Sequence, residues 1–175
     1  NGAFPMFLGT FSAFILLVLV SVSAPLVHSF YYLRTSADDG VRFGVWGYCG
    51  NSGNCTAPQL GYTYGSEISE STSKALILYP VAAAISLFSM MTVAPLMCNP
   101  RRDRYPHPLF CVLSFAASAL SIAAFVISVY LASTATTFFA SQGHSSSFGP
   151  TIWMSLVAAV LLLFVAFHAG CGTCF

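Results

Sequence analysis

The chain has 175 residues, of which 57% are hydrophobic and only 6% are charged. This composition lies far outside the range of soluble globular domains and indicates a protein whose solvent is a lipid bilayer. The formal net charge of +1 provides no basic surface that would hold nucleic acid, so a nucleic-acid partner is not expected.

The charged residues divide the chain into apolar segments. All Asp, Glu, Lys and Arg side chains fall within residues 34–74 and 101–104. The apolar segments at about 4–30 and 75–97 each exceed the ~20 residues that a helix needs to cross the hydrocarbon core. We expect both to be membrane spans, and the first to be retained, because it is longer than a signal-peptide core and no basic run precedes it.

The segment after Arg104 holds no charged residue, yet its length of about 70 residues is too great for one crossing. A polar, turn-prone stretch at 133–150 indicates the break. We therefore place the third span at about 109–131 and the fourth at about 151–169. The sequence predicts one four-span membrane domain over residues 1–175, an all-α helical bundle.

The short loop 99–108 indicates the orientation. It carries Arg101, Arg102 and Arg104 against a single acidic residue, Asp103. Short basic loops remain in the cytosol under the positive-inside rule. Four spans then place both termini of this multi-pass protein in the cytosol and the loop at about 31–74 outside.

The six cysteines separate by predicted membrane face. Cys49 and Cys55 fall in the outer loop, where an oxidising environment favours a disulfide between them. Four lie at the cytosolic ends of spans, where S-palmitoylation and simple burial as small hydrophobic residues are equally compatible with the sequence: Cys98, Cys111, Cys171 and Cys174. The lone Cys171-Gly-Thr-Cys174 pair is a weak zinc pattern, so no metal site is expected.

The outer loop has two further features. Asn54-Cys55-Thr56 fits the N-glycosylation pattern, so Asn54 is a predicted acceptor. Apolar residues alternate along 41–48, which predicts a strand leading into the disulfide, and a second strand is expected around 59–64. The predicted fold is a four-helix bundle with a small, disulfide-stapled extracellular β-sheet.

The sequence gives little indication of catalysis or active transport. The predicted spans contain no Asp, Glu, Lys or Arg, whereas pumps and transporters place such residues within the membrane. No serine, cysteine or carboxylate has the spacing of a nucleophilic or acid–base site. We expect no catalytic residue, no cofactor and no enzyme activity.

One set of motifs resembles a known family. The outer loop reads Gly44-Val-Trp46-Gly47-Tyr48-Cys49, then Cys55 and Leu60-Gly61-Tyr62, and the second span opens with Tyr79-Pro-Val-Ala-Ala. This is similar to the fungal PalI and Sur-seven family over the whole chain. It also resembles the wider claudin-like group, although the spacing between the two cysteines is shorter than in animal claudins.

The resemblance implies a plasma-membrane protein without enzyme activity. Sur-seven members mark eisosomes and affect endocytosis and the cell wall, which implies an organiser of cortical membrane domains that contacts itself or other integral membrane proteins. PalI members assist an ambient-pH receptor, which implies the alternative, an accessory subunit of a larger membrane complex. Either role uses lipids and lateral protein contacts, and small residues within the spans favour close helix packing. A channel lined by Ser and Thr is a third, less economical hypothesis.

Overall fold

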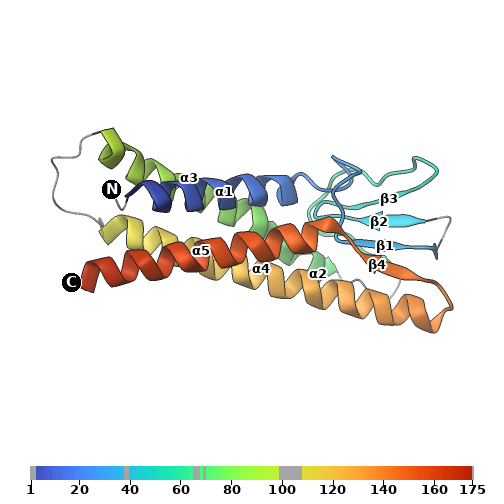
Figure 1. Ribbon diagram of the computed structural model, residues 1–175. Coiled ribbons are helices and arrows are strands. Elements are labelled where there is room, and N and C mark those ends of the chain that lie inside the picture. Colours follow the sequence, from blue (N-terminus) through green and yellow to red (C-terminus); the bar gives the residue numbers. More distant parts are fainter. Residues whose placement is uncertain (1–2, 38–39, 65–67, 69, 99–107, 175) are drawn as a thin grey trace.

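The computed structural model describes residues 3–37, 40–64, 68, 70–98 and 108–174. Four long helices run side by side, and a small sheet caps one end of them (Figure 1). The long helices are α1 (Ala3–Ser21), α3 (Leu78–Cys98), α4 (Pro108–Ser141) and α5 (Pro150–Cys174). A short helix α2 (Glu70–Lys74) and the 3-10 turn η2 (Ala75–Ile77) lead into α3.

The four long helices form the predicted bundle. Each is long and apolar enough to cross a membrane. Helix α1 packs against α3 and α5, and α4 completes the ring by packing against the same two helices. Alanine and serine fill much of the helix contacts, including Ala82, Ser86, Ala117, Ser121 and Ala158, all fully or almost fully buried. Such small residues bring helix backbones close together, as expected for a membrane bundle.

Two helix ends differ from the sequence-based spans. Helix α1 ends at Ser21, so residues 22–30 of the predicted first span form turns, in keeping with Pro25. Helix α4 continues ten residues beyond 131, to Ser141. Its serines and threonines do not break it, because their hydroxyls donate to carbonyls three or four residues earlier, as from Thr136 to Ala132 and from Thr137 to Ser133.

The sheet has four short antiparallel strands in the order β3-β2-β1-β4. They are β1 (Leu33–Thr35), β2 (Val41–Phe43), β3 (Tyr48–Gly50) and β4 (Ser146–Phe148). Together with the segments 22–32 and 44–64 and the last turns of α4, the sheet forms what we call the head. Its inner face, with Leu33, Val41 and Phe43, is buried.

The strand predictions were partly wrong. The alternating segment 41–48 is not one strand but two, β2 and the start of β3, with a turn over residues 44–47. No strand forms at 59–64, where Gln59 donates its backbone N–H to Trp46 O and Tyr64 forms an isolated bridge with Ile68. The other two strands of the sheet are β1 and β4, and β4 follows α4 in the chain. The overall prediction of a helical bundle with a small disulfide-stapled sheet is confirmed.

Candidate functional site

A disulfide between Cys49 and Cys55 closes the edge of the sheet, as predicted. Backbone hydrogen bonds flank it on both sides, from Gly50 N to Asn54 O (2.9 Å) and from Thr56 N to Tyr48 O (3.0 Å). The Thr56 hydroxyl adds a third bond by accepting from Tyr48 N. The staple therefore fixes residues 51–56 along β3 and leaves that edge covered.

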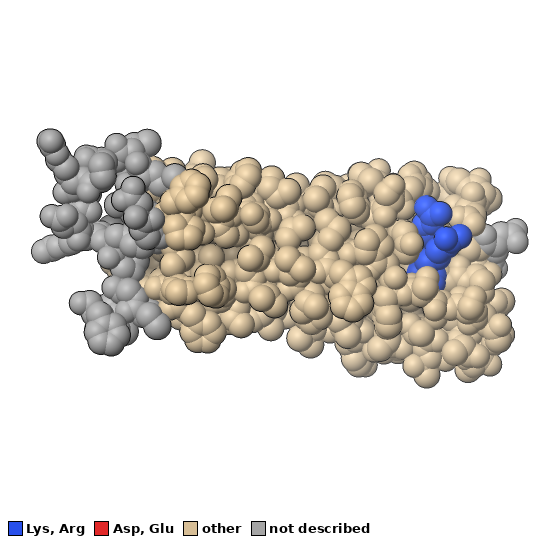
Figure 2. Space-filling model, in the orientation of Figure 1, with Lys and Arg blue, Asp and Glu red and all other residues tan. Residues whose placement is uncertain are grey.

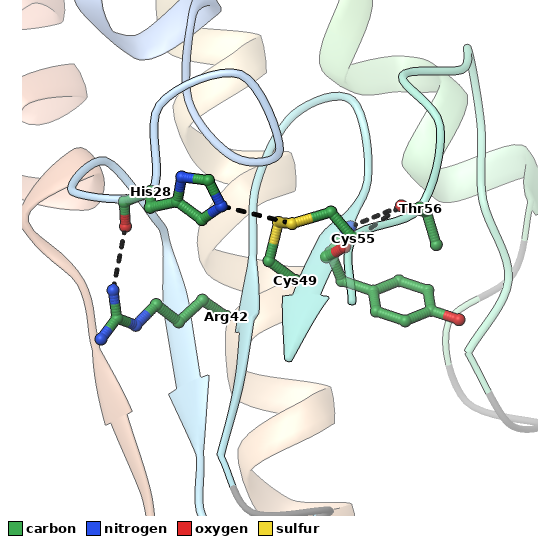
Figure 3. Close-up of a disulfide and its surroundings, with 6 residues drawn as sticks. His28, Arg42, Cys49, Cys55 and Thr56 are labelled. Atoms are coloured by element: carbon green, nitrogen blue, oxygen red, sulfur yellow. Dashed lines mark hydrogen bonds between the residues drawn. A yellow bond between two sulfur atoms is a disulfide. The ribbon is translucent and has the colours of Figure 1, made fainter. Parts of the chain in front are cut away.

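An imidazole lies beside the disulfide. His28 Nε2 is 3.3 Å from Cys55 Sγ, and Arg42 donates to the carbonyl oxygen of His28 (3.3 Å; Figure 3). The ligand atoms of His28, Cys49 and Cys55 lie within 4.8 Å of one another, which resembles a metal-binding group. The two sulfurs are bonded to each other, however, and cysteine ligates metals as a free thiolate. With the disulfide formed, the contact between His28 and Cys55 joins the segment 22–32 to residues 49–55.

The Gly44-to-Gly47 turn docks the sheet onto the end of α1. A Cβ on Gly44 would lie 2.1 Å from the carbonyl oxygen of Ala24, so no other residue fits without moving the backbone. The Trp46 indole N–H donates to Ser21 O (2.6 Å), one of the carbonyls that the helix end leaves without a helical partner. The Ser23 hydroxyl accepts from Val45 N (2.9 Å). The loop motif thus caps α1.

Two buried tyrosines connect the Leu60-Gly61-Tyr62 part of the loop motif to the sheet. The Tyr62 hydroxyl donates to Gly44 O (2.9 Å) and contacts the Tyr32 hydroxyl. The Ser73 hydroxyl accepts from Tyr62 N and donates to Tyr62 O, which joins this segment to α2. Burial raises the pKa of both tyrosines above the usual value for a phenol, and each also affects the other. Both hydroxyls stay protonated donors at ordinary pH.

An aromatic cluster fills the space between the sheet and α4. Phe43 packs edge-on against Tyr64 and lies beside Tyr48 and Phe139. Phe139 belongs to the extension of α4 that the sequence did not predict, so no signal in the sequence pointed to this contact. Tyr32 and Ser73 were missed for a similar reason, because only the folded head brings them to Tyr62.

The structure brings most of the predicted loop-motif residues together. Gly44 lies against Ala24, and Trp46 bonds the end of α1. Tyr48 lies in the aromatic cluster beside Phe43 and Tyr62, and Gly47 packs so closely on Thr56 that a Cβ would be 2.3 Å from its hydroxyl. Gly61 has a positive φ of 79° and places Tyr62 in the core. Leu60 differs from the others, because 47% of its surface is exposed.

The residues predicted to be glycosylated, to be palmitoylated or to set the membrane orientation differ in exposure, and some lie outside the described residues. Asn54 is exposed, so glycosylation there remains a sterically open prediction. Cys111 is a free, half-buried cysteine packed against the cluster of Val93 and Phe110. The other palmitoylation candidates lie near the ends of α3 and α5, with side chains outside the described part: Cys98, Cys171 and Cys174. Arg101, Arg102 and Arg104 lie outside the described residues.

The sequence of this chain matches the model of the SUR7/PalI family over residues 3–165. This chain belongs to the SUR7/PalI family. Among its curated relatives, the pH-response regulator protein palI/RIM9 of Emericella nidulans is 34% identical over 97 residues, which cover 47% of this chain and 17% of that protein. The pH-response regulator protein palI/prr-5 of Neurospora crassa is 31% identical over 148 residues, covering 74% of this chain and 21% of the relative.

The match spans about a fifth of the length of these relatives. The shared part therefore corresponds to the bundle and head described above and not to the remainder of the longer proteins. By name, both relatives are pH-response regulators, and neither name mentions an enzyme activity. The contacts described in the head hold the sheet on the helices through packing and hydrogen bonds.

Proposed function

We propose that this protein is a non-enzymatic accessory protein of a fungal ambient-pH response, acting at the plasma membrane through lateral contact with a larger polytopic protein. The observation that carries this proposal is the 31–34% identity to two proteins named pH-response regulators. Membership of the SUR7/PalI family agrees with it. This favours the accessory role over the cortical organiser as the first hypothesis.

The shape of the molecule supports a contact role. The helices present large apolar side chains outward, including Phe88, Tyr130, Trp153, Phe164 and Phe167, each with more than half of its surface exposed. In a bilayer these side chains meet lipid or a partner helix. The oxidised cysteine pair supports a head outside the cell, and the basic loop at 99–108 supports cytosolic termini.

The test is complementation followed by copurification. We would express the tagged chain in an Emericella nidulans strain lacking palI and measure growth at alkaline pH, with full-length palI as positive control. Restored growth together with one dominant polytopic protein in the gently extracted complex supports the proposal. Normal surface delivery without any rescue and without such a partner contradicts it.

The organiser of cortical membrane domains remains the second candidate, because the same exposed apolar faces suit self-association. Size analysis of the gently extracted protein separates the two roles. A homogeneous self-assembly without a large partner supports the eisosome-like organiser, whereas a one-to-one complex with a larger protein supports the accessory role. Mass spectrometry of the same fraction identifies the partner.

A further inference from the structure

Two arginines lie side by side on the outward face of the sheet. The register pairs Arg34 of β1 directly with Arg42 of β2, and Arg34 with Ser147 of β4. Directly paired residues share a face, so two positive charges are adjacent there. On the face drawn in Figure 2 the Lys and Arg side chains gather at the head. Adjacent like charges destabilise a sheet unless other groups compensate for them.

Only one of the two arginines has such groups. The Arg42 guanidinium lies 5.6 Å from the centre of the Tyr31 ring and donates to His28 O. Arg34 is exposed and has no ion pair or side-chain hydrogen bond with the described residues. The one ion pair among those residues, between Lys74 and Glu70, lies outside the sheet. Arg34 is therefore an exposed cation without a charged partner among the described residues.

A hollow of about 530 Å³ opens beside Arg34 at the tip of the sheet. Its wall carries hydroxyl and amide groups from Ser36, Asn51, Ser145 and Ser147. This volume falls in the range of small-molecule sites. A guanidinium beside several hydroxyls provides donors for a carboxylate or phosphate and for neighbouring ligand hydroxyls.

The wall of the hollow is held in place before any ligand arrives. Two hydrogen bonds join Ser36 and Ser145: Ser36 N donates to the backbone Ser145 O (2.8 Å), and Ser145 N donates to the side-chain hydroxyl of Ser36 (2.9 Å). Asn51 N donates to Gly40 O (2.9 Å), and a Cβ on Gly40 would lie 2.8 Å from Asn51 Nδ2. Fixed polar groups lose little conformational entropy when a ligand binds.

We propose that this hollow binds an acidic sugar, with Arg34 holding its carboxylate or phosphate and the wall groups bonding its hydroxyls. A neutral sugar fits less well, because it has no charged group for Arg34 to bind and the described residues lining the hollow include no aromatic ring that could hold it by stacking instead. The inference needs only the folded head and is independent of the proposed role in pH response. With the head outside the cell, acidic cell-wall glycans are the class of ligand that would meet it.

The experiment is isothermal titration of the purified full chain in nanodiscs at low salt. The probes are glucuronate, mannose 6-phosphate, inorganic phosphate and neutral glucose and mannose. The variant is Arg34→Gln, and the matched control is Lys74→Gln, which removes a cation from outside the hollow. We expect saturable binding of an acidic sugar that Arg34→Gln weakens by about tenfold or more and that Lys74→Gln leaves unchanged.

The probes also separate the two possible acidic groups. Preference for glucuronate indicates a carboxylate ligand, and preference for mannose 6-phosphate indicates a phosphate. Binding of inorganic phosphate as tight as that of the sugar phosphate contradicts a sugar site. Equal binding of neutral sugars, no saturable binding, or the same loss in Lys74→Gln each overturns the proposal.

Asp38 and Asp39 precede Gly40 in the sequence and lie outside the described residues. Each substitution removes one negative charge from the segment that links β1 and β2, so Asp38→Asn and Asp39→Asn are expected to tighten the binding of an anion or leave it unchanged. Weaker binding in either variant would mean that a carboxylate bonds the ligand hydroxyls, and it would overturn the anion site. Circular dichroism of each variant checks that the head has kept its fold.

Discussion

The head and the helical bundle are stabilised in different ways. The head depends on a few specific contacts: one disulfide, a glycine pressed against a backbone carbonyl and a pair of buried tyrosine hydroxyls. The bundle spreads its contacts over many alanines and serines on four helices. Single substitutions should therefore damage the head strongly and the bundle weakly, which five experiments test from the largest effect to the smallest.

Gly44→Ala should have the largest effect. Its new Cβ would lie 2.1 Å from Ala24 O, and the sheet must move away from α1 to make room. We expect a loss of about 3 kcal/mol in the stability of the head, near the upper end for overpacking. Thermal unfolding of the purified protein measures it. Gly50→Ala is the control, since its nearest neighbour would be at an ordinary 3.5 Å. Equal melting of both variants would contradict the tight contact.

Cys49→Ser should cost about 2 kcal/mol, because the chain-entropy account gives a modest gain for so short a closed loop. The unfolded head should then reduce delivery to the cell surface and abolish the mobility shift between reducing and non-reducing gels. Cys111→Ser is the matched control, since Cys111 is a free thiol among the described residues. Unchanged delivery and mobility of Cys49→Ser would show that the staple is dispensable.

Alkaline pH should destabilise the head. The unfolded chain loses the protons of Tyr32 and Tyr62 near pH 10, the usual pKa of a phenol. Burial raises the pKa of both in the folded head, so stability is full below pH 10 and falls as the pH rises above it. We expect a loss of about 1 kcal/mol per tyrosine at pH 11. Absorbance of tyrosinate at 295 nm should show at least two phenols titrating late, and ordinary titration of all the tyrosines would contradict this.

Tyr62→Phe should cost about 1 kcal/mol. It removes the donor to Gly44 O and leaves that buried carbonyl and the Tyr32 hydroxyl each with one bond fewer. Hydrogen exchange of the sheet amides measures the loss. Tyr130→Phe is the control, because the ring of Tyr130 is largely exposed on α4. The variant should also halve the alkaline destabilisation, which links it to the preceding experiment.

The sequence alone predicted the features that follow from hydrophobic composition and from the oxidising environment outside the cell. Four spans follow from apolar length, and the disulfide follows from two cysteines in a predicted outer loop. The alternation at 41–48 did locate the sheet, but it could not reveal the turn, because Gly44 and Gly47 fit the pattern of a strand and are needed instead for close backbone approach.

The remaining features depend on contacts between distant segments. The polar stretch after residue 131 predicted a break, yet Phe139 packs beneath the sheet and extends α4 into the head. Strand β4 pairs with β1 across more than a hundred residues, and neither three-residue strand has a pattern of its own. Tertiary packing therefore decided what local propensity left open.

Ser89→Ala should have the smallest effect. The hydroxyls of Ser89 on α3 and Ser114 on α4 are buried and 3.2 Å apart, one of the polar contacts between these helices. Such bonds are worth about 0.6 kcal/mol on average within membranes, because the separated helices also find partners. A double-mutant cycle with Ser114→Ala measures the coupling. A coupling above about 2 kcal/mol would contradict the difference between head and bundle, since the bundle would then depend on single contacts as the head does.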